Sequence, residues 1–410
     1  MCEQFLQHSI DITKNLSKLE KKEDGIFLTP RIIRQKQIDR TLYWISILKL
    51  KPKLVLEPSC GSLEFFTDLD SYYKNVNFIA VEKNQKVFMK INDLKLVQHN
   101  KLTLINDDFL NTNLVNVDIV IGNPPYFVMN NKDVPIEYKQ YISGRPNIYC
   151  IFILHALKTL NTKKGGILSF VIPKSILNSV YYEGVRKIIY EKYNLLEIID
   201  YKKDDKFMDT DQETVGIIIT NKQDITSPTN YILKTFSGII FSINNATLET
   251  LYKNSTTLKE LGLAVKTGTI VWNQVKDKLT DDKSKTLLLY NSNIISNTVV
   301  LKDFKNNEKK QYINFEKTEQ KPFIVVNRGR GNAEFNMSYC KIDDSNITGN
   351  ILVENHLNII YNVSNTDPQI LDKIITSFKD ERTNRFLSLF AGNNSLSKTE
   401  LETILPIYVM

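Results

Sequence analysis

The chain has 410 residues, of which 42% are hydrophobic and 24% charged, and this length predicts two or three domains. It contains neither a signal peptide nor an apolar run long enough to span a bilayer, so we expect a cytoplasmic protein without a membrane partner. Four cysteines and four histidines are scattered without the spacing of a metal or redox site, so we expect no metal. The formal net charge of +7 favours a polyanionic partner without requiring one.

Strand-like and helix-like segments alternate as far as Thr220, which predicts an α/β fold with a mainly parallel sheet. The first apolar strand begins at Leu54 and ends at Glu57, and small residues lead from it through Gly61 into a helical segment. Sheets of this kind bind nucleotide-like ligands at such strand ends. Gly61 would let the backbone approach a ligand, and Glu57 could accept a cationic amino group. A plain strand, turn and helix would explain the segment, taken alone, equally well.

The next two strands also lead to acidic residues. The strand over residues 76–81 is followed by Glu82, which lies where doubly wound folds hold ribose hydroxyl groups. The strand over residues 102–105 leads to Asp108 and Phe109, a carboxylate and a ring that could read and cover an adenine. Each acid alone could instead be a helix N-cap or a solvated loop charge. Polar side chains at successive strand ends, taken together, predict one shared site.

Asn123-Pro-Pro-Tyr126 follows the next apolar strand and is the most informative motif of the chain. The exocyclic amino group of a base is a poor nucleophile, because its lone pair is delocalised into the ring. The side-chain oxygen of Asn123 and the carbonyl of Pro124 can each accept one amino hydrogen, which draws the nitrogen toward tetrahedral geometry. The prolines stiffen the turn, and Tyr126 offers a ring for stacking on the base. The alternative is an ordinary turn, for which Asn-Pro and Pro-Pro are common.

With these motifs in this order, residues 20 to 220 resemble the gamma-class amino-methyltransferases, the TaqI-like DNA N6-adenine methyltransferases that use S-adenosylmethionine. Thr29-Pro30 matches a family segment that folds over the cofactor. The segment from Asn147 to Phe152 resembles the family's Asn-Leu-Tyr helix start. Phe207, ahead of the strand over residues 214–220, looks like the family's second base-stacking aromatic residue.

The resemblance implies a Rossmann-like class I methyltransferase sheet with a C-terminal mixed α+β target-recognition domain. The implied reaction transfers a methyl group to N6 of an adenine flipped out of double-stranded DNA. The implied partner is that DNA, and a cognate restriction endonuclease is a further candidate partner. The implied catalytic residues are Asn123, Pro124, Tyr126 and Phe207. The implied S-adenosylmethionine-binding residues are Thr29, Glu57, Gly61, Glu82, Asp108, Phe109 and Phe152.

One turn departs from the family pattern. Family turns commonly read Gly-Ser-Gly-Glu, whereas this chain has Gly61-Ser-Leu63-Glu64. A leucine is strained if this position takes a positive φ, but it fits well if the position merely begins a helix. Cofactor affinity depends on which of the two holds.

A polar segment at residues 221–230 predicts a boundary between a catalytic domain, residues 1–222, and a target-recognition domain, residues 231–410. The alternative for the second half is a structural lobe or a protein-docking module. A capping box at Ser397 and Glu400 predicts the start of a last helix. The expected strands of this half lie around residues 264–271, 286–290, 322–326 and 335–341, and the expected helices near 245–255 and 367–390.

Residues 231–410 contain 22 Lys and Arg against 19 Asp and Glu, so DNA contacts must come from local patches. One candidate is the run Lys302, Lys305, Lys309 and Lys310, although a run of this kind is more often a solvated loop. Another is the pair Arg328 and Arg330, since arginine on a glycine-containing loop can reach a guanine edge or a phosphate.

Other functions stay open at this point. RNA base methyltransferases and protein-glutamine methyltransferases use the same tetrapeptide, because a planar amine or amide poses the same chemical problem. A catalytically silent DNA-binding subunit that kept the fold is a third alternative. Leu63 is its support, and failure to bind cofactor would favour it.

Overall fold

The computed structural model describes residues 4–14, 16–17, 19–21, 25–94, 101–201, 213–223, 225, 229–236, 238–302, 304–306, 308–328, 337–390 and 396–409. The chain divides into two compact units. Unit 1 comprises Met1–Leu233 with Gly238–Asn245, and unit 2 comprises Lys234–Ser237 with Ala246–Met410. Each unit is described by itself. Phe207, Arg330 and the start of the strand expected at 335–341 lie outside the described residues.

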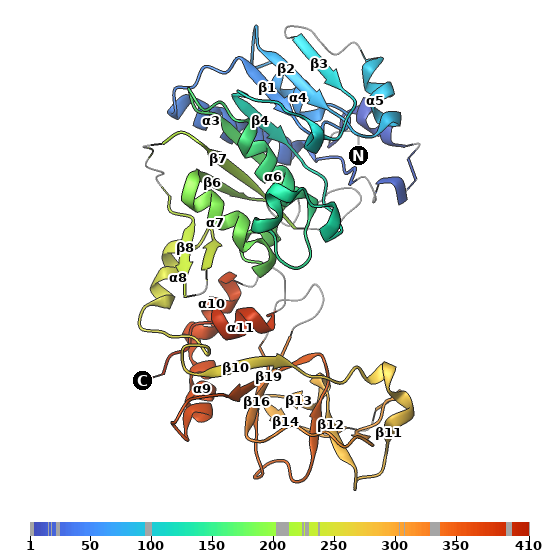
Figure 1. The fold of residues 1–410 in the computed structure, drawn as a ribbon, viewed down its shortest axis with the longest axis vertical. Helices are drawn as coiled ribbons and strands as arrows, with labels where there is room; N and C mark the ends of the chain where they lie inside the picture. The colour runs from blue at the N-terminus through green and yellow to red at the C-terminus, as the bar shows by residue number, and fades with distance from the viewer. Residues whose placement is uncertain are drawn as a thin grey trace. The chain divides into compact units, whose positions relative to one another are not determined.

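Unit 1 is built on a seven-stranded sheet with the order β3-β2-β1-β4-β5-β7-β6 (Figure 1). The pairs among β1 to β5 are parallel, whereas β7 runs antiparallel to both β5 and β6. The strands are β1 (Leu54–Glu57), β2 (Asn77–Val81), β3 (Lys101–Ile105), β4 (Ile119–Gly122), β5 (Ile167–Pro173), β6 (Asn194–Asp200) and β7 (Thr214–Thr220). The prediction of an α/β fold with a Rossmann-like, mainly parallel sheet is confirmed.

Helices cover both faces of this sheet (Figure 1). Side chains such as Leu56 and Val120 pack with α6 and α7 on one face, while their neighbours Val55 and Ile121 pack with α3, α4 and α5 on the other. Burial on both faces explains why β5 and β7 are apolar without alternation. The helices of unit 1 are α1 (Gln7–Thr13), α3 (Arg31–Ile47), α4 (Glu64–Leu69), α5 (Gln85–Asn92), α6 (Ile148–Thr159) and α7 (Glu183–Lys192).

Short 3-10 helices lie in the connections of unit 1. They are η1 (Phe109–Asn111), η2 (Asn131–Asp133), η3 (Ile136–Tyr141), η4 (Lys174–Leu177) and η5 (Val180–Tyr182). The expected helix start at Asn147 is confirmed, since its side chain accepts a hydrogen bond from the backbone N–H of Tyr149 at the start of α6.

Unit 2 is a mixed α+β structure, as predicted. One four-stranded sheet has the antiparallel order β10-β19-β16-β17, and a second has the order β11-β15-β12-β18, in which β12 and β18 are parallel. The strands are β10 (Leu263–Thr267), β11 (Leu279–Thr280), β12 (Thr286–Leu289), β13 (Ile294–Ile295), β14 (Thr298–Val299), β15 (Tyr312–Ile313), β16 (Phe323–Asn327), β17 (Tyr339–Ile342), β18 (Ile351–Val353) and β19 (Leu357–Asn362). Strands β8 (Ile232–Thr235) and β9 (Gly238–Phe241) pair near the boundary between the units.

The helices of unit 2 correct one expectation. In place of one helix over 367–390 there are α9 (Ile370–Lys379) and α10 (Glu381–Phe390), separated by Asp380 in an extended conformation. The Asp380 side chain accepts a hydrogen bond from the backbone N–H of Arg382, so it ends one helix and caps the next. The predicted capping box of Ser397 and Glu400 is present at α11 (Lys398–Thr403), and α8 spans Asn245–Tyr252.

Leu63 adopts the left-handed conformation, with φ 62° and ψ 37°, directly before α4. Leu63 therefore has the positive φ that strains a leucine, and it is not an ordinary first residue of a helix. The side chain is fully buried in the core beneath the turn. Burial of a leucine stabilises the fold by about 1.5–3 kcal/mol, which offsets a left-handed cost of roughly 1–2 kcal/mol.

This balance predicts an unusual order of stabilities at position 63. Leu63→Ala and Leu63→Gly both lose the buried side chain, at a cost of about 2–5 kcal/mol, but only glycine also relieves the strain. We expect Leu63→Gly to have the higher free energy of unfolding, by roughly 1 kcal/mol. Urea denaturation of both variants measures this difference. An alanine variant more stable than the glycine variant would contradict it.

Candidate active site

A cavity lies at the carboxyl ends of β1, β2, β3 and β4, and it encloses about 910 Å³ of empty space, including a part open to solvent. Eight of the residues implied by the sequence line it: Thr29, Glu57, Gly61, Glu82, Asp108, Phe109, Asn123 and Phe152. Pro124 and Tyr126 are not among the lining residues, and Phe207 is not described. The strand ends therefore meet at one site, because parallel strands place their carboxyl ends at the same edge.

The Asn123 amide is held in one orientation. Its Nδ2 donates to Thr29 Oγ1 at 3.0 Å and lies 3.4 Å from the carbonyl oxygen of Phe27. Both amide hydrogens are thus directed at the segment that precedes α3, and Oδ1 is left as the acceptor. This is the orientation that acceptance of an amino hydrogen requires.

Tyr126 differs from the simple expectation of a stacking ring. Its hydroxyl donates to Asn123 Oδ1 and lies 2.7 Å from the carbonyl oxygen of Val171. Burial raises the pKa of this phenol well above its usual range, and the ring meets Tyr149 edge-on at 6.2 Å between centroids. A buried phenol requires an acceptor, and here it uses the same oxygen that the motif would offer to a substrate.

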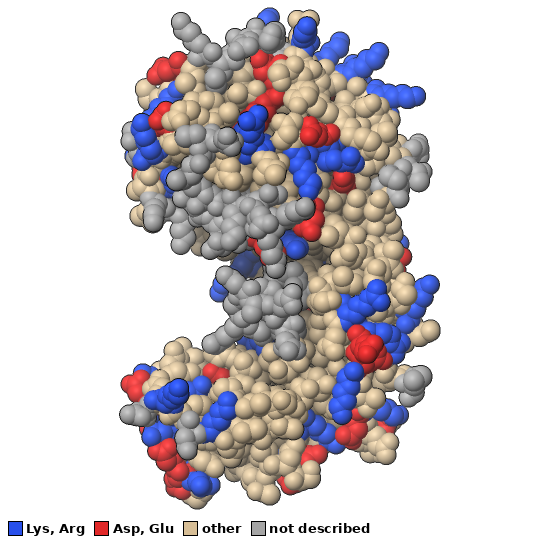
Figure 2. All heavy atoms as spheres, turned by 180° about the vertical axis from the view of Figure 1, so that it is seen from behind, with Lys and Arg blue, Asp and Glu red and all other residues tan. Residues whose placement is uncertain are grey.

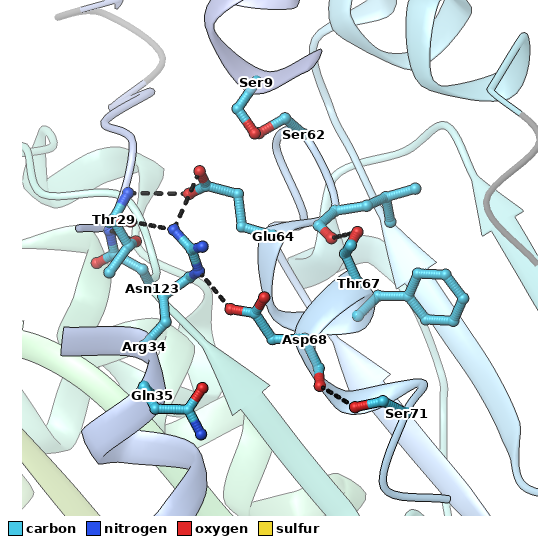
Figure 3. Close-up of polar contacts among 12 residues, drawn as sticks. Ser9, Thr29, Arg34, Gln35, Ser62, Glu64, Thr67, Asp68, Ser71 and Asn123 are labelled. Atoms are coloured by element: carbon cyan, nitrogen blue, oxygen red, sulfur yellow. Dashed lines mark hydrogen bonds and ion pairs between the residues drawn. The ribbon is translucent and has the colours of Figure 1, made fainter. Parts of the chain in front are cut away.

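Thr29 is fixed by a buried ionic network (Figure 3). Its backbone N–H donates to Glu64 Oε2 at 2.9 Å, and its carbonyl accepts from Arg34. Arg34, on α3, is fully buried; its Nε donates to Asp68 at 2.8 Å and its Nη1 lies 3.3 Å from Glu64 Oε1. Through Thr29, this network also fixes the amide of Asn123.

Sequence reasoning missed Arg34 and Glu64 as parts of the site. A signal existed for Arg34, which lies beside the apolar Ile33 and Ile38 on the buried face of α3, where an unpaired charge would be costly. Glu64 lines the cavity, and burial raises the pKa of its carboxyl despite the neighbouring Arg34. No signal in the sequence pairs the two.

The turn after β1 forms a cradle for a ligand. Gly61 has φ +49°, and a Cβ added there would meet nothing within 4 Å. Glu82 fixes the turn, because its Oε2 accepts from Gly61 N at 2.9 Å while its Oε1 accepts from Asn84 N at 2.7 Å. On its other side, the turn contacts α1, where Ser62 Oγ donates to Ser9 Oγ at 2.8 Å (Figure 3).

Asp108 and Phe109 close the cavity at the end of β3. The Asp108 carboxylate caps η1 by accepting from Leu110 N at 3.0 Å, and it lies 3.0 Å from Lys83 Nζ. Asp108 therefore acts as an N-cap and also lines the cavity. Phe109 is buried against Phe152, with 5.3 Å between ring centroids, so the two rings form an apolar wall.

Glu57 lies at the end of β1 and is almost fully buried, with Oε2 accepting from Phe66 N at 3.1 Å. Burial raises the pKa of its carboxyl well above the usual 4.5, and the charge of Glu64 raises it further. A cationic group bound in the cavity would offset this cost, because an opposite charge favours the ionised carboxylate.

Glu57→Gln is expected to stabilise the protein without ligand. A carboxyl whose pKa is raised on folding stabilises the fold fully below pH 4.5, and this contribution is lost as pH rises toward the folded value. The glutamine variant should therefore melt above the wild type at pH 8, and the difference should disappear toward pH 4. Affinity for S-adenosylmethionine should fall about tenfold or more, as for loss of a charged hydrogen bond. Thermal unfolding between pH 4 and 8 and titration calorimetry measure both effects.

Among the described residues no group of three or more His, Cys, Asp or Glu side chains could hold a metal ion. Within the same residues, no helix is both long and apolar enough to cross a membrane.

Comparisons with known proteins match this chain to a family model, to curated proteins and to a solved structure. Residues 9–207 match the family described as Eco57I restriction-modification methylase. The chain is 28% identical over 414 residues to the Type II methyltransferase M.CvrRI of Paramecium bursaria Chlorella virus XZ-6E, covering 98% of this chain and 99% of that protein. It is 27% identical over 420 residues to the modification methylase CviBIII of Paramecium bursaria Chlorella virus NC1A, covering 99% of both chains. The solved structure of the type IIG restriction endonuclease BpuSI covers 97% of this chain and 60% of its own, with a TM-score of 0.46 and 12% identity.

Proposed function

Residues 9–207 match the family described as Eco57I restriction-modification methylase, and from this match we propose that the chain methylates double-stranded DNA at the N6 amino group of adenine in a specific sequence. The observation that carries the proposal is the Asn123 amide, whose nitrogen is held by Thr29 while its oxygen remains as an acceptor beside the cavity. A planar amine presented to that oxygen and to the Pro124 carbonyl would lose conjugation with its ring and become nucleophilic.

The residues of the cavity suit S-adenosylmethionine, which supplies an electrophilic methyl group when bound. The open Cβ position of Gly61 leaves room for a ligand against the backbone. Glu57 and Glu64 are both buried carboxylates that line the cavity, and Glu64 is already paired with Arg34, so a cationic ligand would chiefly offset the burial of Glu57. We assign cofactor binding to Thr29, Glu57, Gly61, Glu82, Asp108, Phe109 and Phe152.

The target adenine must leave the duplex, because its amino group cannot meet a bulky sulfonium inside the base stack. Asn123 Oδ1 would then exchange the Tyr126 hydroxyl, which also lies 2.7 Å from the carbonyl oxygen of Val171, for an amino hydrogen. We assign stacking to Tyr126 and Phe207. The bound cofactor would supply the methyl group, and the amine polarised by Asn123 and the Pro124 carbonyl would accept it. The amino proton leaves afterwards from the cationic nitrogen, so no strong base is needed.

We propose that residues 1–222 form the catalytic domain and residues 231–410 the target-recognition domain. On the face that Figure 2 shows, lysine and arginine side chains are interspersed with acidic ones, so contacts with DNA on this face would be local. A cognate restriction endonuclease is a further proposed partner, because the matched family is described as a restriction-modification methylase.

The first experiment incubates the purified protein with labelled S-adenosylmethionine and duplex DNA, and identifies the methylated nucleoside by mass. N6-methyladenine is the expected product. Cofactor binding without a product on DNA would favour RNA or a protein glutamine as the substrate, and competition among these substrates would identify which. No cofactor binding would favour a catalytically silent subunit.

A further inference from the structure

Unit 2 contains a hollow that the reaction described above does not use. It contains about 1060 Å³ of empty space, including a part open to solvent, and its lining residues come from four connections: Val271, Trp272, Asn273, Asn291, Ser292, Lys309, Glu354, Asn355 and His356. The parallel strands β12 and β18 both end beside it, at Leu289 and Val353. Resting on the proposed function, we propose that this hollow reads base edges of the DNA recognition sequence.

The hollow is rich in side chains that can donate and accept hydrogen bonds. The side chains of Asn273, Asn291 and Ser292 have no hydrogen-bond partner in the part of the chain that is described, and Asn273 and Ser292 are exposed. The Asn355 Oδ1 atom is buried and also lacks a donor among the described residues. An amide offers both an acceptor and two donors, which is the combination that distinguishes base edges.

A buried carboxylate orients the His356 ring, which could also form a hydrogen bond with a base edge. Its Nδ1 lies 2.7 Å from Glu354 Oε1, and Glu354 is only 3% exposed. The second carboxylate oxygen lies 3.4 Å from the backbone N–H of Asn291, so Glu354 links two walls of the hollow. A carboxylate beside Nδ1 keeps a hydrogen there, which leaves Nε2 of a neutral ring as an acceptor. An amino group of adenine or cytosine fits that acceptor.

Trp272 and Lys309 add a ring and a positive charge. The Lys309 ammonium lies 4.0 Å from the centroid of the Tyr290 ring, 4.8 Å from that of Phe304 and 5.6 Å from that of Trp272. This placement limits the motion of the ammonium and holds it beside the amides. Lysine contacts with phosphate position a protein on DNA, whereas amide contacts with bases specify the sequence. Within the run from Lys302 to Lys310, we therefore assign Lys309 a contact with phosphate.

The amides and the lysine predict different phenotypes, and this difference tests the proposal. Methylation kinetics of the full-length protein are measured on the cognate duplex and on duplexes with single-base changes, and methylated positions are mapped by sequencing. We expect Asn273→Ala, Asn291→Ala and His356→Ala to lower the cognate-to-altered ratio of kcat/KM about tenfold or more at one position each. Lys309→Ala should lower the affinity for all duplexes by the same factor and reduce the salt dependence of binding.

Asn350→Ala is the matched control, because Asn350 is an exposed amide at the opposite, amino end of β18. Cofactor affinity of every variant should equal that of the wild type. Because Asn273 is exposed, Asn273→Ala should stay folded, and it still tests the proposal if a variant at a less exposed position unfolds. The proposal would be overturned if all three alanine variants, Asn273→Ala, Asn291→Ala and His356→Ala, kept the wild-type cognate-to-altered ratio of kcat/KM. It would also be overturned if they lost kcat/KM equally on all duplexes. A wild type that methylates no DNA would instead overturn the proposed function on which it rests.

Discussion

Asn123→Ala should lower kcat for adenine methylation by about 10²–10³-fold, the usual effect of removing one preorganised group that stabilises developing charge. The alanine variant loses the oxygen that polarises the amine, but it leaves the turn with Gly61 and the buried Glu57 unchanged. Affinity for S-adenosylmethionine should therefore change by no more than a few-fold. Single-turnover kinetics with a tritiated methyl group, together with titration calorimetry, separate the two quantities.

Tyr126→Phe is the matched control for this prediction. It keeps the ring for stacking and removes the hydroxyl that donates to Asn123 Oδ1. We expect it to retain most of the activity, whereas Tyr126→Ala should lose a stacked contact of about 1–3 kcal/mol. Full turnover by Asn123→Ala, or loss of activity in Tyr126→Phe equal to that in Asn123→Ala, would refute the assigned roles.

Arg34→Met should destabilise the protein by about 3–5 kcal/mol, because removing one partner leaves buried carboxylates without their counter-charge. Arg34 is 0% exposed and contacts Glu64, Asp68 and the carbonyl of Thr29. Methionine preserves most of the volume, so the loss reflects charge and hydrogen bonds more than a cavity. Urea denaturation gives the free energy of unfolding.

The control lies two turns further along the same helix. Arg40 is also paired with a carboxylate, since its Nε lies 2.8 Å from Glu197, but its side chain is 36% exposed. Solvent screens such a pair, so Arg40→Met should cost about 1 kcal/mol or less. If Arg34→Met and Arg40→Met destabilised the protein equally, burial would not be what makes the loss of the Arg34 ion pairs costly. Because Thr29 connects Arg34 to Asn123, Arg34→Met should also lower kcat under conditions in which the variant is folded.

The sheet of unit 1 was predictable because its information is local. Each strand is a short apolar run, and each leads to a polar residue such as Glu57, Glu82 or Asn123. Parallel pairing then brings these ends to one edge whatever the details of the connections. In unit 2 the prediction was less complete. Strand β19 lies between β10 and β16, yet it was not predicted, because antiparallel pairing over long sequence separations leaves no local signature.

The sequence by itself determined the chemistry available at the site, since the residue types that can polarise an amine or hold a cofactor are fixed by Asn123-Pro-Pro-Tyr126 and the acidic strand ends. Only the tertiary structure decided how these groups are oriented. The contact of Thr29 with Asn123, the pairing of Arg34 with Glu64 and the left-handed Leu63 all depend on segments far apart in the chain. Such contacts form when the core closes, because burial removes the water that would otherwise satisfy each group separately.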